Sequence, residues 1–320
     1  MTGADYEYMA RALQLATRGL YTTHPNPRVG CVLVRDGTII GEGWHERAGE
    51  PHAELHALQQ AAEGARGATA YVTLEPCCHH GRTPPCSEAL IKAGVARVVV
   101  AMTDPNPKVA GQGLEQLKRA GIPVETGVLQ SEAEKLNPGF IMRMQNRRPY
   151  VRCKLAMTLD GRTATAAGES KWITGEAARA DVQRLRAQSS AIMTGINTVL
   201  ADDPRFTVRL DELEPSVVRQ PLRVIVDSKL RMPSNARMLS ERGQTLVLTC
   251  VQDEIRKVPL LKAGAEVVSL ADAQGKVDLG AALLLLAERY YEVNEVLLEA
   301  GPVLSGAMLE QGLIDELVIY

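Results

Sequence analysis

The chain has 320 residues, of which 45% are hydrophobic and 23% charged, and its formal net charge is −2 at pH 7. These values are ordinary for a globular protein, and a chain of this length usually divides into two domains. It contains no dense Lys/Arg run for nucleic-acid binding and no signal-peptide pattern, and its longest apolar run, at 280–291, is too short to span a bilayer. We therefore expect a soluble cytoplasmic protein that binds neither nucleic acid nor membranes.

Helix and strand patterns alternate along the first half of the chain. A helical periodicity ends at Gly19, a residue type that commonly follows a helix, and a strand, a turn and a second strand follow at 29–34 and 38–44. Further helical patterns occupy 53–62, 87–94 and 113–121, and further strand patterns occupy 68–75, 97–102 and 123–128. This alternation predicts a mostly parallel sheet covered by helices on both faces.

One helix is expected from about Ser131 to Gln145, and the following "NRRP" is interpreted as a linker. The predicted domains are therefore 1–147 and 148–320. In the second domain, strands are predicted at 150–161, 191–195, 222–228, 245–250, 295–300 and 315–320, and helices at 176–188, 279–290 and 304–312.

Histidine and cysteine gather in the first domain. The histidines all lie before residue 81: His24, His45, His52, His56, His79 and His80. Three of the six cysteines are clustered, namely Cys77, Cys78 and Cys86, whereas Cys31, Cys153 and Cys250 are scattered in strand-like runs and are read as buried apolar residues. In a cytosolic chain, a tight cysteine cluster favours a metal site over a disulfide framework.

Two motifs in this region predict a catalytic zinc site. "PHAELHAL" places His52 at the start of a helix with Glu54 two residues later, and "EPCCHHGRTPPC" leads from a strand into another helix. If the two helix starts converge, His52, Cys77 and Cys86 provide three ligands and leave a fourth position for water. Glu54 then moves a proton from that water to a leaving amine without binding the metal itself.

The spacing matches the zinc-deaminase signature H-x-E with P-C-x-x-C, except that eight residues separate the two cysteines instead of two. We interpret the longer segment as an insertion stiffened by proline, in which His79 and Arg82 could face a substrate anion. A structural zinc site is the alternative, with Cys78, His79 or His80 as its fourth ligand. Two competing functions are a nucleic-acid base deaminase with the same zinc site, which the lack of a basic groove disfavours, and a non-enzymatic zinc-stabilised binding module, which Glu54 beside His52 disfavours.

Two further segments have both a functional and an ordinary interpretation. Asn26, held between prolines in "HPNPRVG", could hydrogen-bond a heterocycle through its amide, or could belong to a simple turn. In the second domain no G-x-G-x-x-G follows a first strand, but the turn from Gly301 to Gly306 lies between a strand and a helix, where backbone amides can bind phosphate. A plain strand–helix turn would look the same.

Long motifs along essentially the whole chain resemble the bifunctional riboflavin-biosynthesis deaminase/reductase family of bacteria. They include "HPNPRVGCVLV", "GEGWHERAGEPHAELHAL", "YVTLEPCCHHGRTPPC", "KLAMTLDGRTATAAGESKWITG" and "LLEAGPVLSGAMLEQGLIDELVIY". The resemblance implies an α/β chain with a cytidine-deaminase-like α/β/α domain followed by a dihydrofolate-reductase-like domain. The first would remove the 2-amino group of a diamino-hydroxy-phosphoribosylaminopyrimidine, and the second would use NADPH to reduce the ribose of the resulting aminouracil to a ribityl chain. We also expect one zinc ion per chain and a homo-oligomer, with a dimer favoured.

The resemblance also implies roles for individual residues. Zinc would be held by His52, Cys77 and Cys86, with Glu54 as proton shuttle. Substrate contacts of the deaminase would be Asn26, His45, His79 and Arg82, and those of the reductase Ser170, Arg186, Phe206, Arg209 and Glu299. Cofactor contacts would be Ala156, Trp172, Thr198, Asp202, Ser228, Gly301, Pro302, Val303, Leu304, Ser305, Gly306 and Ala307.

Four individual residues of the second domain have a possible chemical role. Arg186 and Arg209 suit a sugar phosphate because guanidinium binds phosphate through two parallel hydrogen bonds. Lys154 and Asp202 are candidates for assisting ring opening or protonation. Cys78 stands where the family often has serine. Family members continue past "DELVIY", so we expect the reductase sheet to be truncated at its C-terminal end.

Overall fold

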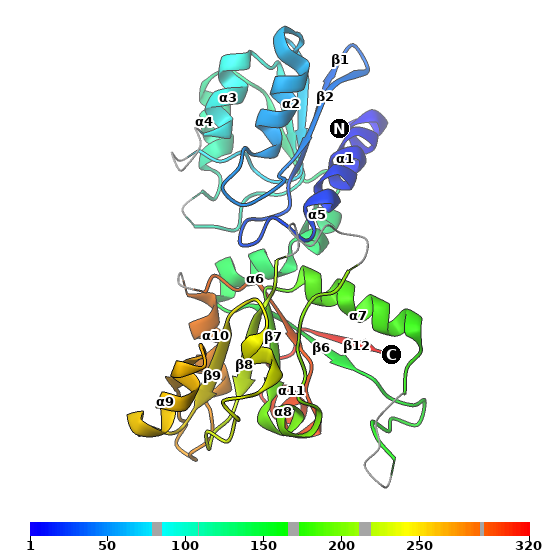
Figure 1. Ribbon diagram of the computed structural model, residues 1–320. Helices are drawn as coiled ribbons and strands as arrows, with labels where there is room; N and C mark the ends of the chain where they lie inside the picture. Colours follow the sequence, from blue (N-terminus) through cyan, green and yellow to red (C-terminus); the bar gives the residue numbers. More distant parts are fainter. Residues whose placement is uncertain (79–84, 108, 166–172, 211–218, 289–290) are drawn as a thin grey trace. The chain divides into compact units, whose positions relative to one another are not determined.

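The computed structural model describes residues 1–320 except 79–84, 108, 166–172, 211–218 and 289–290. The chain divides into two compact units, Met1–Asn146 and Arg147–Tyr320. Each unit has its own β-sheet with helices packed on it (Figure 1).

The N-terminal unit contains a five-stranded sheet of order β2-β1-β3-β4-β5 among the described residues. Its strands are β1 (Gly30–Arg35), β2 (Thr38–Trp44), β3 (Thr69–Val72), β4 (Arg97–Val100) and β5 (Val124–Thr126). β1 pairs antiparallel with both β2 and β3, whereas β3–β4 and β4–β5 are parallel. The sheet is therefore mixed, and it departs from the predicted mostly parallel arrangement at β1, which runs antiparallel to both of its neighbours. The tight turn at Asp36 and Gly37, both with positive φ, makes β1 and β2 a hairpin.

Helices cover both faces of this sheet. They are α1 (Gly3–Ala16), α2 (Ala53–Ala61), α3 (Cys86–Ala93), α4 (Gln112–Arg119), α5 (Gln130–Leu136) and α6 (Pro138–Asn146), with 3-10 turns at Thr17–Gly19 and Ala62–Ala65. Alternate strand residues point to opposite faces, so Leu33 packs with α2, α3 and α4, while Val32 packs with α1, α5 and α6.

The single helix expected from Ser131 to Gln145 is in fact two, α5 and α6, separated by Asn137. Pro138 disfavours a helical conformation of the residue before it, and Asn137 has φ −126° and ψ 40°. The Asn137 side chain, 4% exposed, accepts from Arg28 N at 2.8 Å and donates to Arg28 O at 2.9 Å. The break therefore fixes the loop that carries Asn26.

The C-terminal unit contains a seven-stranded sheet of order β10-β9-β8-β7-β11-β6-β12, in which every described pairing is parallel. Its strands are β6 (Tyr150–Leu155), β7 (Ala191–Gly195), β8 (Leu222–Val226), β9 (Thr245–Thr249), β10 (Glu266–Ser269), β11 (Glu295–Leu298) and β12 (Glu316–Ile319). The predicted strand at 150–161 ends early, at Leu155. All carboxyl ends of these strands lie at one edge of the sheet, where ligands of parallel α/β folds usually bind.

Helices of this unit are α7 (Glu176–Gln188), α8 (Ile196–Asp202), α9 (Glu254–Lys262), α10 (Leu279–Ala287) and α11 (Pro302–Glu310), with a 3-10 turn at Arg237–Ser240. They pack on two hydrophobic clusters, one on each face of the sheet. Helices α8 and α9 and strand β10 were not predicted from the sequence. Among the described residues, no helix is both long and apolar enough to cross a membrane.

Candidate active sites

Two helix starts bring three metal-binding side chains together in the N-terminal unit. His52 is the N-cap of α2, Cys86 is the first residue of α3, and Cys77 lies in the segment between β3 and α3. His52 Nδ1 lies 3.2 Å from Cys86 Sγ and 3.6 Å from Cys77 Sγ, and the three ligand atoms all lie within 4.8 Å of one another. The structure therefore places the three predicted ligands around one point.

Close packing of α2 against the sheet fixes the position of His52. A Cβ atom on Gly43 of β2 would lie 2.2 Å from Ala53 O, and one on Gly41 would lie 2.2 Å from Ala57 O. Since these are backbone atoms that cannot move aside, only glycine lets β2 approach the helix this closely. The same packing leaves Ala53 and Ala57 fully buried.

The donor set fits a zinc ion. A neutral imidazole and thiolate sulfurs are its preferred ligands. The Cys86 thiol and the His52 ring beside it lower the pKa of Cys77, whereas the Cys77 sulfur and burial raise the pKa of Cys86. The backbone N–H of Cys86, at the start of α3, also donates to Cys77 Sγ at 3.4 Å, which stabilises negative charge there.

Glu54 lies in the first turn of α2 and is only 3% exposed. Burial raises the pKa of its carboxyl group, the His52 ring opposes this effect, and the Cys77 sulfur adds to it. A carboxyl group beside the ligand atoms with a raised pKa can take up and return a proton.

Asn26 and His45 are also brought to this site. His45 Nδ1 lies 3.2 Å from Pro51 O, which can only accept, so Nδ1–H donates and Nε2 accepts from Asn26 Nδ2 at 3.0 Å. The His45 ring packs edge-on against His52, with centroids 5.3 Å apart, and is 2% exposed. Burial lowers the pKa of His45, which keeps the ring neutral.

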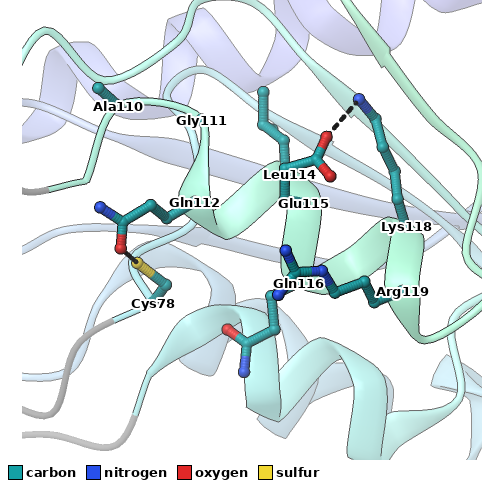
Figure 2. Close-up of a pocket in the computed structure, with 9 residues that line it drawn as sticks. All are labelled: Cys78, Ala110, Gly111, Gln112, Leu114, Glu115, Gln116, Lys118 and Arg119. Carbon is teal, nitrogen blue, oxygen red and sulfur yellow. Dashed lines mark hydrogen bonds and ion pairs between the residues drawn. The ribbon is translucent and has the colours of Figure 1, made fainter.

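The remaining candidates of this region lie elsewhere or outside the described residues. His79, His80 and Arg82 belong to the undescribed segment 79–84. Cys78 is not part of the ligand cluster found among the described residues; its Sγ donates to Gln112 Oε1 at 3.9 Å. A pocket of about 690 Å³ lies along α4 and is lined by residues that include Cys78, Gln112, Gln116 and Arg119. Figure 2 shows these side chains. His52, Cys77 and Cys86 do not line this pocket.

In the C-terminal unit, polar side chains gather at the carboxyl ends of β6, β7 and β11. Arg186 of α7 donates from Nε and Nη2 to the two carboxylate oxygens of Glu299 at 2.6 and 2.9 Å. Lys154, at the end of β6, lies in the field of both groups, and burial lowers the pKa of its amine. Thr194 Oγ1 donates to Glu299 O at 2.7 Å. Thr194 was not predicted as a site residue, although it is the polar residue in the otherwise apolar strand "AIMTG".

The other reductase candidates are placed as follows. Phe206 is buried with φ +47°, and the Arg186 guanidinium lies 5.4 Å from its ring centre. Arg209 is exposed, and its backbone N–H donates to Gln183 at 3.0 Å. Ser170 and Trp172 lie outside the described residues.

Several predicted cofactor contacts lie at the carboxyl edge of the parallel sheet. Gly301 is the N-cap of α11, directly after β11, and Gly301, Pro302 and Val303 are exposed. By contrast, Leu304 packs into the core, and Ser305 Oγ donates to Ala300 O at 3.3 Å. The rest follow other strands of the sheet: Ala156 after β6, Thr198 and Asp202 on α8 after β7, and Ser228 after β8, while Gly306 and Ala307 continue α11.

Comparison with known proteins covers both units. The RibD C-terminal domain family matches residues 149–320, and the cytidine and deoxycytidylate deaminase zinc-binding region matches residues 3–102. The riboflavin biosynthesis protein RibD of Escherichia coli (strain K12) is 53% identical over 324 residues, which cover 99% of this chain and 87% of that protein. The chain belongs to the RibD family.

Solved RibD structures are similar over nearly the whole chain. Acinetobacter baumannii RibD, form 1, has a TM-score of 0.91 and 50% identity, covering 99% of this chain and 86% of that one. A diaminohydroxyphosphoribosylaminopyrimidine deaminase/5-amino-6-(5-phosphoribosylamino)uracil reductase from Thermotoga maritima has a TM-score of 0.83 and 39% identity, with 96% and 84% coverage.

The predicted family and its two-part α/β fold are confirmed. As a RibD-family member, the chain is a bifunctional enzyme of riboflavin biosynthesis, a deaminase and a reductase. A nucleic-acid base deaminase and a non-enzymatic zinc module are set aside, because a RibD C-terminal domain follows the deaminase region.

Proposed function

We propose that the N-terminal unit hydrolyses 2,5-diamino-6-(5-phosphoribosylamino)pyrimidin-4(3H)-one at its 2-amino group, and that the C-terminal unit reduces the ribosyl group of 5-amino-6-(5-phosphoribosylamino)uracil with NADPH. The convergence of His52 Nδ1, Cys77 Sγ and Cys86 Sγ beside the buried Glu54 carboxyl carries the proposal for the first reaction. The name of the Thermotoga maritima relative, which states both activities, supports the pairing of substrates.

In the deaminase reaction, His52, Cys77 and Cys86 would hold one zinc ion. Zinc with three protein ligands lowers the pKa of water in its open position to near neutrality. Glu54 accepts a proton from the attacking water on a carboxylate oxygen and delivers it to the departing amine, so that ammonia leaves. Its burial favours this role, because the raised pKa makes the protonated form accessible between the two transfers.

Asn26 orients the pyrimidine. One N–H of its amide donates to His45 Nε2, so its oxygen can accept a hydrogen bond from a heterocycle and its second N–H can donate one. The buried His45 ring is held by its hydrogen bond to Pro51 O, and it in turn fixes the orientation of the Asn26 amide. His79 and Arg82 complete the proposed substrate contacts from the undescribed segment.

In the reductase reaction, NADPH supplies the hydride. The exposed N-terminus of α11 at Gly301 offers backbone N–H groups to the cofactor phosphates. Arg186 holds the Glu299 carboxylate, Thr194 holds the Glu299 backbone oxygen, and Lys154 lies in the field of the ion pair. In this arrangement Glu299 and Lys154 bind and orient the ribose. Lys154 and Asp202 remain the candidates for proton transfer during ring opening.

The test is incubation of the purified chain with the diaminopyrimidine nucleotide and NADPH, with ammonia release and NADPH absorbance followed separately. Both signals are expected, and supplied deaminated substrate should give NADPH oxidation alone. Absence of ammonia release from zinc-loaded protein would refute the proposed first reaction. Metal analysis tests the one-zinc stoichiometry, sedimentation tests the expected dimer, and fractionation of the source cell tests the cytoplasmic location.

A further inference from the structure

Glu75 is a buried carboxylate that has no part in the proposed chemistry. It lies two residues before Cys77 and is 3% exposed. Its Oε2 accepts from Asp104 N at 3.1 Å and Gly111 N at 2.9 Å, and its Oε1 accepts from Gly113 N at 2.9 Å and Leu114 N at 3.4 Å. Each carboxylate oxygen is therefore matched to two backbone donors.

These donors make Glu75 the cap of a helix that is remote in sequence. The first N–H groups of a helix have no partner within it, and in α9 and α10 the N-cap residues Asp253 and Asp278 supply one from their own side chains. In α4 the N-cap is Gly111, which has no side chain to do so. Glu75 takes that role from the segment that leads to Cys77, and its charge suits the positive end of the helix.

The same segment is held closely from both sides. A Cβ atom on Gly113 would lie 2.1 Å from Pro76 O, so α4 packs directly on the main chain between Glu75 and Cys77. On the other side, Ser87 of α3 donates from its backbone N to Cys77 O at 3.1 Å, and its Oγ lies 2.9 Å from the same oxygen. Ser87 Oγ also lies 2.6 Å from Gln116 Oε1 of α4.

We propose that Glu75 is a positioning residue for the metal centre. By joining the Glu75–Cys77 main chain to the start of α4, it fixes Cys77 Sγ opposite His52 and Cys86. The inference rests on the proposed function, because it assumes that these three residues hold zinc.

The hydrogen-bond pattern makes a specific demand on the side chain at this position. Glutamine has the size of glutamate, but one of its two terminal groups is an NH₂ donor, and in either orientation that group would face two N–H donors. Aspartate is one methylene shorter but keeps two accepting oxygens. The proposal therefore ranks Glu75→Gln as more damaging than Glu75→Asp, the opposite of the order expected if the site required only packing volume.

The experiment measures the rate at which zinc-loaded full-length protein releases zinc to a competing chelator, well below the melting temperature of each variant. Partners that orient metal ligands typically change metal affinity by about 10–100-fold. We expect Glu75→Gln to release zinc at least ~10-fold faster than the original chain, Glu75→Asp to be intermediate, and amide exchange at Gly111, Gly113 and Leu114 to increase in both.

Two controls separate positioning from general stability. Glu115→Gln removes an exposed carboxylate of the same helix, and Leu117→Ala removes a fully buried core side chain of α4 without touching Glu75. Both should release zinc at the original rate. NADPH oxidation with supplied deaminated substrate should be unchanged in every variant.

The inference is overturned if Glu75→Gln releases zinc like the original chain, if Glu75→Asp is the worse of the two, or if Leu117→Ala accelerates release equally. If Glu75→Gln does not fold, the comparison of Glu75→Asp with Leu117→Ala decides in the same way. Failure of the original chain to bind zinc would instead refute the proposed function.

Discussion

Arg186 and Glu299 form a two-point ion pair in the reductase unit, with Nε–Oε1 and Nη2–Oε2 distances of 2.6 and 2.9 Å. The two residues are 113 positions apart in the sequence, and their side chains are only 13% and 10% exposed. Arg186 therefore cannot offer these two donors to a substrate phosphate while the pair is intact. In the structure its guanidinium serves first to hold Glu299.

Glu299→Gln should impair reduction and leave deamination unchanged. The amide keeps the shape of the side chain but leaves the buried guanidinium without its counter-charge, which costs roughly 1–3 kcal/mol of stability in the C-terminal unit. We expect kcat/KM for NADPH oxidation to fall at least ~10-fold, which corresponds to 1.4 kcal/mol of transition-state stabilisation. Glu176→Gln, on an exposed carboxylate, is the matched control. A normal rate of reduction by Glu299→Gln would show that the Glu299 carboxylate is not needed for the reductase reaction.

Cys86→Ser should lose zinc. Serine at the start of α3 keeps the size of the side chain but replaces the soft thiolate ligand by a hydroxyl group. We expect metal analysis to show less than about a tenth of the original zinc content. Cys78→Ser, whose sulfur is outside the cluster, should retain the metal. Full zinc content with intact deamination in Cys86→Ser would reject the ligand assignment.

Glu54→Gln should stop deamination but keep the metal. Glutamine fills the same buried space but cannot accept and return the proton, and general acid–base groups contribute typically about 10²–10⁴-fold to rate. Zinc content and NADPH oxidation with deaminated substrate should match the original chain, because Glu54 is neither a ligand nor in the reductase unit. An unchanged rate of ammonia release would show that the proton moves by another route.

Gly301→Leu should weaken NADPH binding without disturbing the fold. Among the described residues, no atom lies within 4 Å of a Cβ built on Gly301, so the added side chain is expected to obstruct a ligand that approaches the start of α11. We expect the Kd for NADPH, measured by fluorescence titration, to rise at least ~10-fold, or 1.4 kcal/mol. Gly175, the N-cap of α7, has nearly the same backbone conformation and equal space, so Gly175→Leu is a matched control. Equal NADPH affinity in both variants would place the phosphates elsewhere.

Asp5 should make the N-terminal unit sensitive to acid. It is 1% exposed and bonded to Arg97 at 2.7 Å, and this contact lowers the pKa of its carboxyl group. Because the folded-state pKa is below the unfolded value of about 4, the stabilisation is complete above about pH 5 and is lost as the pH falls through the folded-state value. Asp5→Asn should cost roughly 2 kcal/mol at pH 7 and less at pH 3, because the loss begins near the unfolded-state pKa and is complete only below the folded-state pKa.

Urea denaturation followed by amide exchange in β4, at several pH values, checks this expectation for Asp5. The matched control is Asp36→Asn, because the Asp36 side chain is 92% exposed. A difference between Asp5→Asn and the original chain that does not change with pH would contradict the ionic origin of the effect.

Local patterns in the sequence determined most of the elements and the chemistry of the first site. Helix α7 and strand β7 begin and end where the sequence pattern predicts, because α7 has a helical pattern of apolar residues and β7 is a short, continuously buried apolar run. His52, Glu54, Cys77 and Cys86 could be named in advance because each side chain is tied to the start of a helix by a short motif, and helix starts are recognisable from sequence. The break at Asn137 could have been anticipated from Pro138 by the same local rule.

Only the tertiary structure decided the contacts between residues that are far apart in the chain. One such contact is the antiparallel pairing of β1 with β3, which brings together strands that are separated by a helix in the sequence. Others are the capping of α4 by Glu75 and the pairing of Arg186 with Glu299, which cannot be read locally because a carboxylate or a guanidinium suits an exposed surface equally well. Gly113 shows the same limit: its role depends on Pro76 O, which lies close by only after α4 has packed on the sheet. Sequence fixes which groups can bind, donate or accept, and burial in the folded chain decides which of them meet.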